Sequence, residues 1–285
     1  MMDTNFLHQL DRFSLIINKR VTSNYSGERK SEEIGRGLIF RDHQIYMPGE
    51  DFRSIDWKVF ARTDKLFIKR YEEERNLTVH VLVDYSASMN FGRGQRKKSD
   101  FAGMIGMGFA YMALKNNERF VLSTFSDNLE FFKPRRGKRQ IMNILNFLNT
   151  KKPVGNMQLD KASALYRKKT SKHRSLMVII SDFLYSIDEI KNTLQRFKDN
   201  DLILIQVLDT LERDLKLEGD FRLKDLESNA RMRTFISPYL RKNYERMLND
   251  HIARIHQACD LVGAEFYSAN TGQEIFDVFY DVLGF

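Results

Sequence analysis

Short apolar runs alternate along most of this chain with longer segments in which apolar residues recur every three or four positions. The short runs are rich in Val, Ile and Leu, which is typical of buried strands, and the longer segments have the period of amphipathic helices. Strands that alternate with helices indicate an α/β fold with a mostly parallel sheet. From residue 77 to the end we therefore expect such a sheet with helices on both faces.

The predicted elements follow from these periods. Buried strands are expected at residues 77–83, 175–182, 202–208 and 264–268, and a hairpin at 119–133 adds one antiparallel edge strand. Helices are expected at about 100–115, 141–148, 160–169, 188–198, 240–262 and 274–283. Gly103, Gly106 and Gly108 lie inside the first of these helices and do not form a phosphate-binding motif, so we interpret them as sites of close packing on the sheet. Residues 209–238 are predicted to be polar and irregular.

The first 76 residues have a different pattern. Residues 5–21 read as an amphipathic helix that docks on its own domain, and with the polar linker that follows they form segment 1–33. Residues 34–76 show no sustained period over most of their length, so we expect an irregular elaboration packed on the main domain, residues 77–285, with short strands at 39–40, 45–46 and 66–68. The lone tryptophan, Trp57, is expected to anchor this elaboration.

An acidic loop rich in hydroxyl groups follows the first buried strand. Asp84, Ser86 and Ser88 stand at every second position, so their oxygens can converge on one small cation. The strand at 175–182 also ends in an aspartate, Asp182. Ligands of open α/β sheets bind beyond the carboxyl ends of the strands, where the strand order reverses. The sequence therefore predicts that Asp84 and Asp182 share a cation site; a plain turn with a helix cap, or one aspartate that is protonated or turned outward, is the alternative.

Composition and charge limit the kinds of partner that we expect for this chain. With 285 residues, of which 42% are hydrophobic, it can fill one large core. The net charge is +8, with basic runs at 93–98, 133–139 and 167–174. We interpret these runs as solvated surface, because they lack the interleaved aromatic residues of a stacking platform. An acidic protein partner and a nucleic acid remain open, with nucleic acid the less favoured.

The location of the protein is suggested by what the sequence lacks. Cys259 is the single cysteine, which fits a reducing compartment. No apolar run reaches membrane-spanning length, and residues 1–10 do not have the apolar region of a signal peptide. We therefore expect a cytoplasmic protein without a transmembrane segment.

Familiar catalytic motifs are absent from the sequence. There is no nucleophile elbow and no phosphate-binding Walker sequence. A phosphatase that used Asp84 as its nucleophile would want a second carboxylate two residues later, and Ser86 stands there instead. We therefore do not expect an enzyme. The alternative is a Mg²⁺- or Mn²⁺-dependent phosphoester hydrolase that uses Asp84 and Asp182.

The order of these features resembles a known domain. A buried strand, a D-x-S-x-S loop, a helix and a later strand that ends in aspartate resemble the von Willebrand factor type A domain, a Rossmann-like fold, over residues 77–285. The resemblance implies a metal-ion-dependent adhesion site in which Asp84, Ser86, Ser88 and Asp182 bind Mg²⁺ or Mn²⁺, directly or through water. In that family a partner protein often supplies the last ligand of the ion.

A more specific resemblance lies upstream of this domain. The segment from Gly35 to Arg75 looks like the signature of domain-of-unknown-function family 58, in which a Y-x-P-G-D-D-x-R-x-I-D-W string and an A-R pair precede the type A domain. The matching residues are Tyr46, Pro48, Gly49, Asp51, Arg53, Ile55, Asp56, Trp57, Ala61 and Arg62, and Glu50 replaces the first aspartate of the string. The resemblance implies a non-enzymatic adaptor or scaffold that works with a MoxR-type AAA+ ATPase in assembling or maturing other protein complexes.

One position departs from the type A pattern. The family's cation site usually draws a threonine from a G-G-T loop, and here the loop reads Gly155-Asn156-Met157. A thioether is a poor ligand for a hard cation, although an amide oxygen of Asn156 or Gln158 is an alternative. We therefore expect Mg²⁺ or Mn²⁺ to bind weakly or not at all, with Asp84 and Asp182 then held by Lys, Arg or water.

Overall fold

The structure is a computed structural model of the chain, and it describes residues 6, 8–11, 38–73, 78–92, 97–156, 158–170, 175–224, 226 and 230–283. The chain divides into two compact units. One unit holds residues 1–20 and 77–285, and the other holds residues 21–76.

The larger unit is built on a six-stranded sheet with the order β10-β7-β6-β3-β4-β5. All neighbouring strands pair in parallel except β5, which is antiparallel to β4. The central strands are buried on both faces, which explains their unbroken apolar runs. The predicted parallel sheet with one antiparallel edge strand is confirmed. Its strands are β3 (Thr78–Asp84), β4 (Arg119–Phe125), β5 (Leu129–Glu130), β6 (Leu176–Ser181), β7 (Asp201–Leu208) and β10 (Glu265–Asn270).

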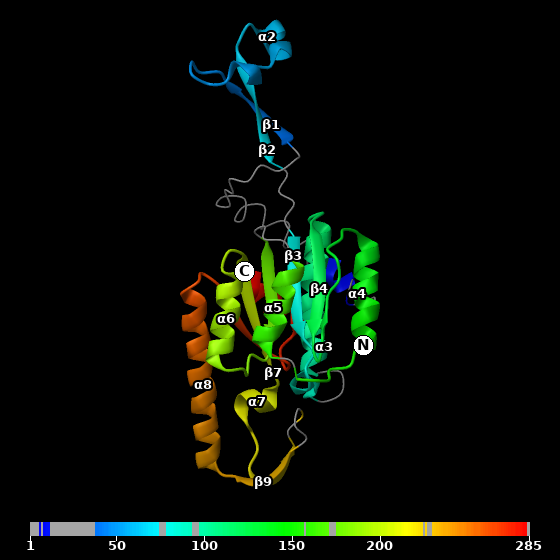
Figure 1. Cartoon of the computed structure of the whole chain (residues 1–285), viewed down its shortest axis with the longest axis vertical. Helices are drawn as coiled ribbons and strands as arrows, with labels where there is room; N and C mark the ends of the chain where they lie inside the picture. The colour runs from blue at the N-terminus through cyan, green and yellow to red at the C-terminus, as the bar shows by residue number, and fades with distance from the viewer. Residues whose placement is uncertain are drawn as a thin grey trace. The chain divides into compact units, whose positions relative to one another are not determined.

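Helices cover both faces of this sheet, as predicted (Figure 1). On one face α3 packs on β3 and β4 and also contacts α4 and α9. On the other face α5, α6 and α8 close an apolar core that includes Leu82, Ile179 and Leu204 of the sheet. The helices are α3 (Lys98–Lys115), α4 (Lys138–Thr150), α5 (Leu159–Lys169), α6 (Ile187–Phe197), α8 (Pro238–Asp260) and α9 (Ile275–Leu283).

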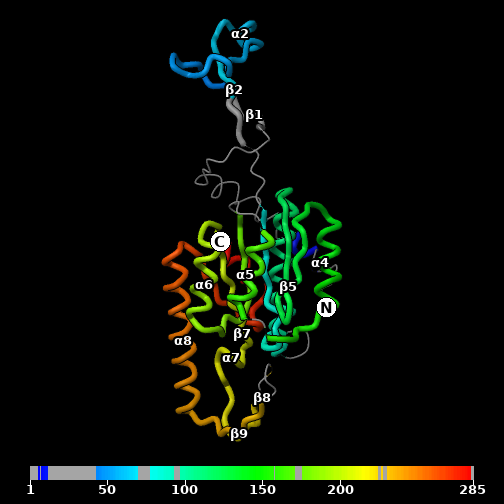
Figure 2. The backbone as a smooth tube through the Cα atoms, in the orientation of Figure 1, coloured from blue at the N-terminus to red at the C-terminus, as the bar shows by residue number. Residues whose placement is uncertain are grey.

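Residues 209–238 are more regular than predicted. They form the short helix α7 (Thr210–Asp214) and the antiparallel strands β8 (Gly219–Lys224) and β9 (Arg231–Ile236). Figure 2 shows that β8 and β9 lie together past α7, at the end of the sheet where β7 ends. We call this segment, from α7 to β9, the insert. The prediction of an irregular segment was wrong because neither strand has a buried face that would give it an apolar period.

The described residues of the N-terminal helix dock on the larger unit. Phe6 and Leu10 are buried, and the Phe6 ring lies 6.4 Å from the ring of Phe276 in α9. The hydroxyl of Tyr111 donates a hydrogen bond to Asp11, which also forms an ion pair with Lys115. Residues 12–37 lie outside the described part of the chain. No helix among the described residues is both long enough and apolar enough to cross a membrane.

The smaller unit is more regular than predicted, because the short strands expected in it are parts of one hairpin. β1 (Leu38–Ile45) pairs antiparallel with β2 (Phe67–Glu73), and the turn η1 (Phe52–Ser54) and the helix α2 (Trp57–Thr63) lie between them. Asp56 caps α2 through the amides of residues 58 and 59. Its carboxylate also pairs with His43, and that hydrogen bond lowers the pKa of Asp56 to about 2.

Trp57 does not lie in the core of the smaller unit. It is 59% exposed and meets only the edge of Phe60 among the aromatic rings of the described residues. Among the residues of this unit whose burial the structure describes, its neighbours Ile55 and Asp56 are the buried ones. Packing of this unit on the main domain stays a prediction.

Two glycines let α3 approach the sheet and α9 closely, which confirms the close-packing interpretation for them. A Cβ atom on Gly106 would lie 3.0 Å from Leu122 and 3.1 Å from Val83. A Cβ atom on Gly108 would lie 2.0 Å from the Phe279 ring, which is fully buried. Any larger residue at 108 must therefore displace Phe279.

We predict that Gly108→Ala lowers the free energy of unfolding by ~1–3 kcal/mol, because the added methyl group overpacks the α3–α9 contact. Urea denaturation measures this loss. Shortening the ring in the double variant Gly108→Ala/Phe279→Leu should recover part of it relative to Phe279→Leu alone. An unchanged urea midpoint for Gly108→Ala would contradict the packing described here.

Candidate functional site at the carboxyl edge of the sheet

The two predicted aspartates come from neighbouring strands at the point where the strand order reverses. β3 is followed by β4 on one side, while β6 lies on its other side. Asp84 is the last residue of β3, and Asp182 follows the last residue of β6. The hydroxyl of Ser181 donates to Asp84 at 2.6 Å, so the ends of the two strands are directly joined. The structure therefore brings Asp84 and Asp182 to one edge, as predicted.

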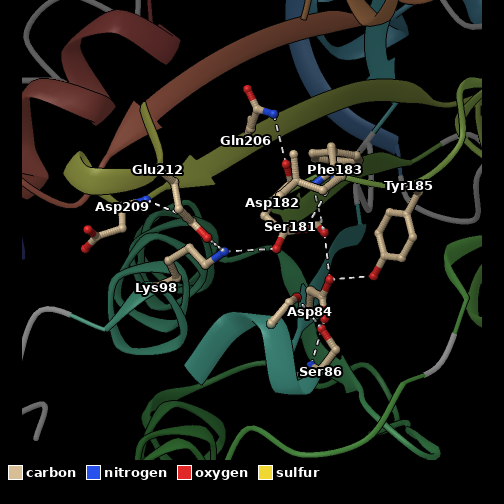
Figure 3. A network of polar contacts seen from close by, with 12 residues as sticks. Asp84, Ser86, Lys98, Ser181, Asp182, Phe183, Tyr185, Gln206, Asp209 and Glu212 are labelled. Carbon is tan, nitrogen blue, oxygen red and sulfur yellow. Dashed lines mark hydrogen bonds and ion pairs between the residues drawn. The ribbon is translucent and has the colours of Figure 1, made fainter. Parts of the chain in front are cut away.

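Asp84 is fully buried, and protein donors occupy both of its oxygens. Oδ1 accepts from the amide of Ser86 at 2.8 Å. Oδ2 accepts from the hydroxyl of Ser181 and, at 2.7 Å, from that of Tyr185. Burial, and next the charge of Asp182, raise the pKa of Asp84 to about 6, although the three hydrogen bonds oppose this shift. Asp84 is thus a carboxyl group whose lone pairs are committed to the protein (Figure 3).

Lys98 is the cation of this edge. Its side chain is 0% exposed, and its Nζ lies 3.0 Å from Asp182 and 2.8 Å from Glu212 (Figure 3). Burial alone would lower the pKa of Lys98, but the two carboxylates outweigh it and the pKa is raised. The ammonium group therefore keeps its charge, and it holds the start of α3 against the end of β6.

Glu212 extends the network into the insert. It forms a capping box with Asp209, whose backbone amide donates to Glu212 at 3.0 Å. Tyr244 of α8 donates its hydroxyl to the carbonyl of Glu212 at 2.8 Å, and Thr271 donates to the carboxylate of Asp209. The Lys98–Glu212 ion pair therefore fixes α7 at the edge of the sheet, and the hydrogen bond from Tyr244 fixes it against α8.

The loops around Asp84 are held by backbone hydrogen bonds. The amide of Ala87 donates to the carbonyl of Gly155, and the amide of Val154 donates to the carbonyl of Tyr85. Ser86 and Ser88 share a hydrogen bond at 3.0 Å between their hydroxyl groups. These two hydroxyls point toward one another, and only Ser86 contacts Asp84, through its amide.

Phe183 adds a strained backbone next to Asp182. Its φ of +50° lies in the left-handed region, which is unusual for a bulky residue. The amide of Phe183 donates to the Ser181 hydroxyl, and its carbonyl pairs with His251 of α8 at 2.8 Å. Strain that the surroundings hold in place is common at binding surfaces and active sites.

A divalent cation does not fit this arrangement of side chains. Both oxygens of Asp84 are bound by donors, and the ammonium group of Lys98 occupies Asp182. Among the described residues no group of three or more His, Cys, Asp or Glu side chains is placed to hold a metal ion. Met157, the residue predicted to weaken the site, lies outside the described residues. Binding of Mg²⁺ or Mn²⁺ by Asp84, Ser86, Ser88 and Asp182 stays a prediction.

Sequence reasoning missed the residues that complete this network. Lys98 ends a basic run that is predicted to be solvated, and Glu212 lies in the segment that is predicted to be irregular, but Lys98 is buried and Glu212 caps α7. The D-x-x-E spacing of Asp209 and Glu212, directly after a buried strand, was the one local signal available, because it is typical of a capping box. No local pattern pairs Lys98 with a carboxylate 84 residues away.

Comparison with known proteins gives one family. The family described as "Protein of unknown function DUF58" matches residues 42–254. Uncharacterized proteins of Mycobacterium bovis and Mycobacterium tuberculosis are 26% identical over 276 residues, which cover 95% of this chain and 87% of theirs. The match confirms the predicted resemblance to family 58.

Solved structures resemble the chain at low sequence identity. The conserved hypothetical protein BatB of Bacteroides thetaiotaomicron is 11% identical with a TM-score of 0.44, over 73% of this chain and 96% of that one. The SpRpn10 VWA domain is 12% identical with a TM-score of 0.44, over 72% of this chain and 94% of that one. The order and layers of the sheet described above agree with the predicted α/β fold of the von Willebrand factor type A kind.

We predict that Lys98→Met lowers the free energy of unfolding by ~3–5 kcal/mol, because it leaves Asp182 buried without its cation. Chemical denaturation at neutral pH measures this. Lys97→Met is the matched control, since the Lys97 side chain donates a hydrogen bond to the exposed Asn90 and not to a buried carboxylate. Equal effects of the two substitutions would mean that the ion pair with Asp182 does not stabilise the edge.

The raised pKa of Asp84 gives a prediction with a definite sign. A carboxyl group that binds its proton more tightly in the folded chain stabilises the fold at low pH, and this contribution is lost as the pH rises from about 4 to about 6. Asp84→Asn removes this titration. The free energy of unfolding of the variant minus that of the wild type should therefore rise over this interval, by roughly 3 kcal/mol.

Denaturation curves at a series of pH values measure this difference. Asp250→Asn, at an exposed position of α8, is the matched control for the loss of one carboxyl group. A constant difference for Asp84→Asn would show that Asp84 does not titrate as described.

Proposed function

The chain belongs to the DUF58 family, and we propose that it acts as a non-enzymatic protein-interaction module. In this proposal it is an adaptor or scaffold that works with a MoxR-type AAA+ ATPase in the cytoplasm, in the assembly or maturation of protein complexes. The ATPase partner is suggested by the resemblance of residues 35–75 to the family signature.

Burial of the charged groups at the carboxyl edge supports interaction rather than catalysis. Asp84 and Lys98 are 0% exposed and Asp182 is 2% exposed. A hydrolase that used Asp84 and Asp182 would need both carboxylates open to a metal ion and to substrate. Here their oxygens are bound by hydroxyl, amide and ammonium donors of the protein, so the hydrolase alternative gains no support.

The same edge presents apolar side chains to solvent. Val154 is 52% exposed and Leu184 is 49% exposed. Both stand on loops that the network fixes, because the amide of Val154 bonds to Tyr85 and that of Leu184 to the carboxylate of Asp182. A surface that is already ordered loses less conformational freedom on binding. We propose that a partner docks on Val154 and Leu184, and that any Mg²⁺ or Mn²⁺ binding at this edge is weak.

The test is co-purification of this chain with a MoxR-type AAA+ ATPase from the same organism, in the presence of nucleotide and magnesium. Leu184→Asp should weaken the complex by about tenfold or more, since a charge replaces an apolar contact at the centre of the surface. Leu261→Asp is the matched control, because Leu261 is 83% exposed at the far end of α8.

Two results would argue against the proposed function. Failure of the wild-type chain to retain the ATPase is one of them. The other is magnesium- or manganese-dependent phosphoesterase activity that Asp84→Ala abolishes and Leu261→Asp leaves intact, which would favour the hydrolase.

A further inference from the structure

The hairpin of β8 and β9 projects from the larger unit with little packing of its own. Ile236, at its base, is the one residue of the described hairpin that is buried. The hairpin is joined to the sheet through α7, which Lys98 and Tyr244 hold at Glu212. Its attachment is therefore firm, while its own surface is left to solvent.

The register divides the hairpin into a basic face and an apolar face. Arg222 lies opposite Arg233, and the next pair along is Leu223 opposite Met232. Successive residues of a strand point to opposite faces, so the arginines share one face and Leu223 and Met232 share the other. Arg231 belongs to the arginine face by the same alternation.

On the arginine face, one arginine pairs with an acidic side chain, and two do not pair with any acidic side chain of the described residues. Arg233 donates hydrogen bonds to both carboxylate oxygens of Asp220. Arg222 and Arg231 are exposed, and within the described residues no acidic side chain pairs with either of them. Like charges directly opposite each other destabilise a sheet, so the Arg222–Arg233 pair works against the hairpin on its own.

The other face exposes large apolar groups. Met232 is 61% exposed and Leu223 is 40% exposed. Phe235, on the arginine face, is 64% exposed. Exposed Met, Phe and Arg together are typical of the surfaces by which proteins recognise one another. Two strands alone are also marginally stable in water, and each of these strands has an edge that no other described strand pairs.

We propose that this hairpin takes up a third strand from an acidic protein partner. The strand would be extended and would alternate acidic with aliphatic residues. Its backbone would pair with a free edge of the hairpin, as in other cases of strand addition. Alternation would then place the carboxylates on the face of Arg222 and Arg231 and the aliphatic groups on the face of Leu223 and Met232. This inference names the chemistry of a partner and rests on the proposed role as an interaction module.

A protein segment fits this surface better than a nucleic acid does. Phosphates would pair with Arg222 and Arg231 but would leave Met232 and Leu223 exposed. Nucleic-acid affinity also grows with the number of neutralised phosphates, and two free arginines supply few such contacts. The alternating strand satisfies both faces at once.

The test uses the full chain and a fluorescein-labelled peptide of about eight residues that alternates Glu and Val. Fluorescence anisotropy should show saturable binding. The double variant Arg222→Glu/Arg231→Glu should bind the peptide roughly tenfold more weakly or worse. The matched control Lys161→Glu/Lys168→Glu changes the net charge equally at exposed positions of α5 and should bind as the wild type does.

Two further probes sharpen the test. A peptide of the same composition with its Glu and Val residues in two blocks should bind more weakly, because it cannot match both faces. Met232→Asp should also weaken binding of the alternating peptide. Equal binding of the two peptides would overturn the alternating-strand arrangement.

The inference is overturned if the alternating peptide does not bind the wild type, or binds all variants equally. It is also overturned if a labelled single-stranded DNA binds more tightly than the peptide and loses affinity in the Arg222/Arg231 variant. The proposed function fails separately, when the ATPase does not co-purify with the wild type. Each readout can therefore fail without the other.

Discussion

The ion pair between Lys98 and Asp182 is the interaction on which the carboxyl edge of this protein depends. It joins the first residue of α3 to the residue that follows β6, and the second contact of Lys98, with Glu212, adds the insert. Removing an ammonium group and a carboxylate from water costs several kcal/mol each, so such a pair persists only where its geometry is good and other hydrogen bonds complete it. Here two carboxylates share one ammonium group, and backbone amides bind each carboxylate.

This constraint separates the two kinds of surface that the protein offers. The polar groups at the strand ends are buried and bound to one another, so their hydrogen bonds and ion pairs lie inside the protein. The loops and the insert that the network fixes carry the exposed apolar and basic side chains, among them Leu184, Met232 and Arg222. A fixed interior that presents ordered loops is suited to binding other proteins, because less ordering remains to be done on association.

Local pattern predicted most of the sheet and half of the network. Buried strands have unbroken apolar runs, so β3, β6 and β7 could be predicted from the sequence. Ligands bind where the strand order reverses, and this rule predicted that Asp84 lies beside Asp182. The burial of Lys98 could not be predicted, because the sequence of a basic run does not distinguish a buried lysine from a solvated one. The hairpin of β8 and β9 was missed because both of its faces are mostly exposed, so neither strand has an apolar period. The exposure of Trp57 was not predicted, because a large aromatic ring is highly buried on average.

The most direct test of this account is a calorimetric titration of the wild-type protein with Mg²⁺ and with Mn²⁺ at neutral pH. If the ammonium group of Lys98 is the cation of the edge, neither ion should bind saturably at concentrations below about 1 mM. A dissociation constant of about 1 mM corresponds to a binding free energy of roughly −4 kcal/mol. Saturable binding in the micromolar range, lost in Asp182→Asn, would contradict it, because Asp182 cannot hold Lys98 and a divalent ion as this structure arranges them.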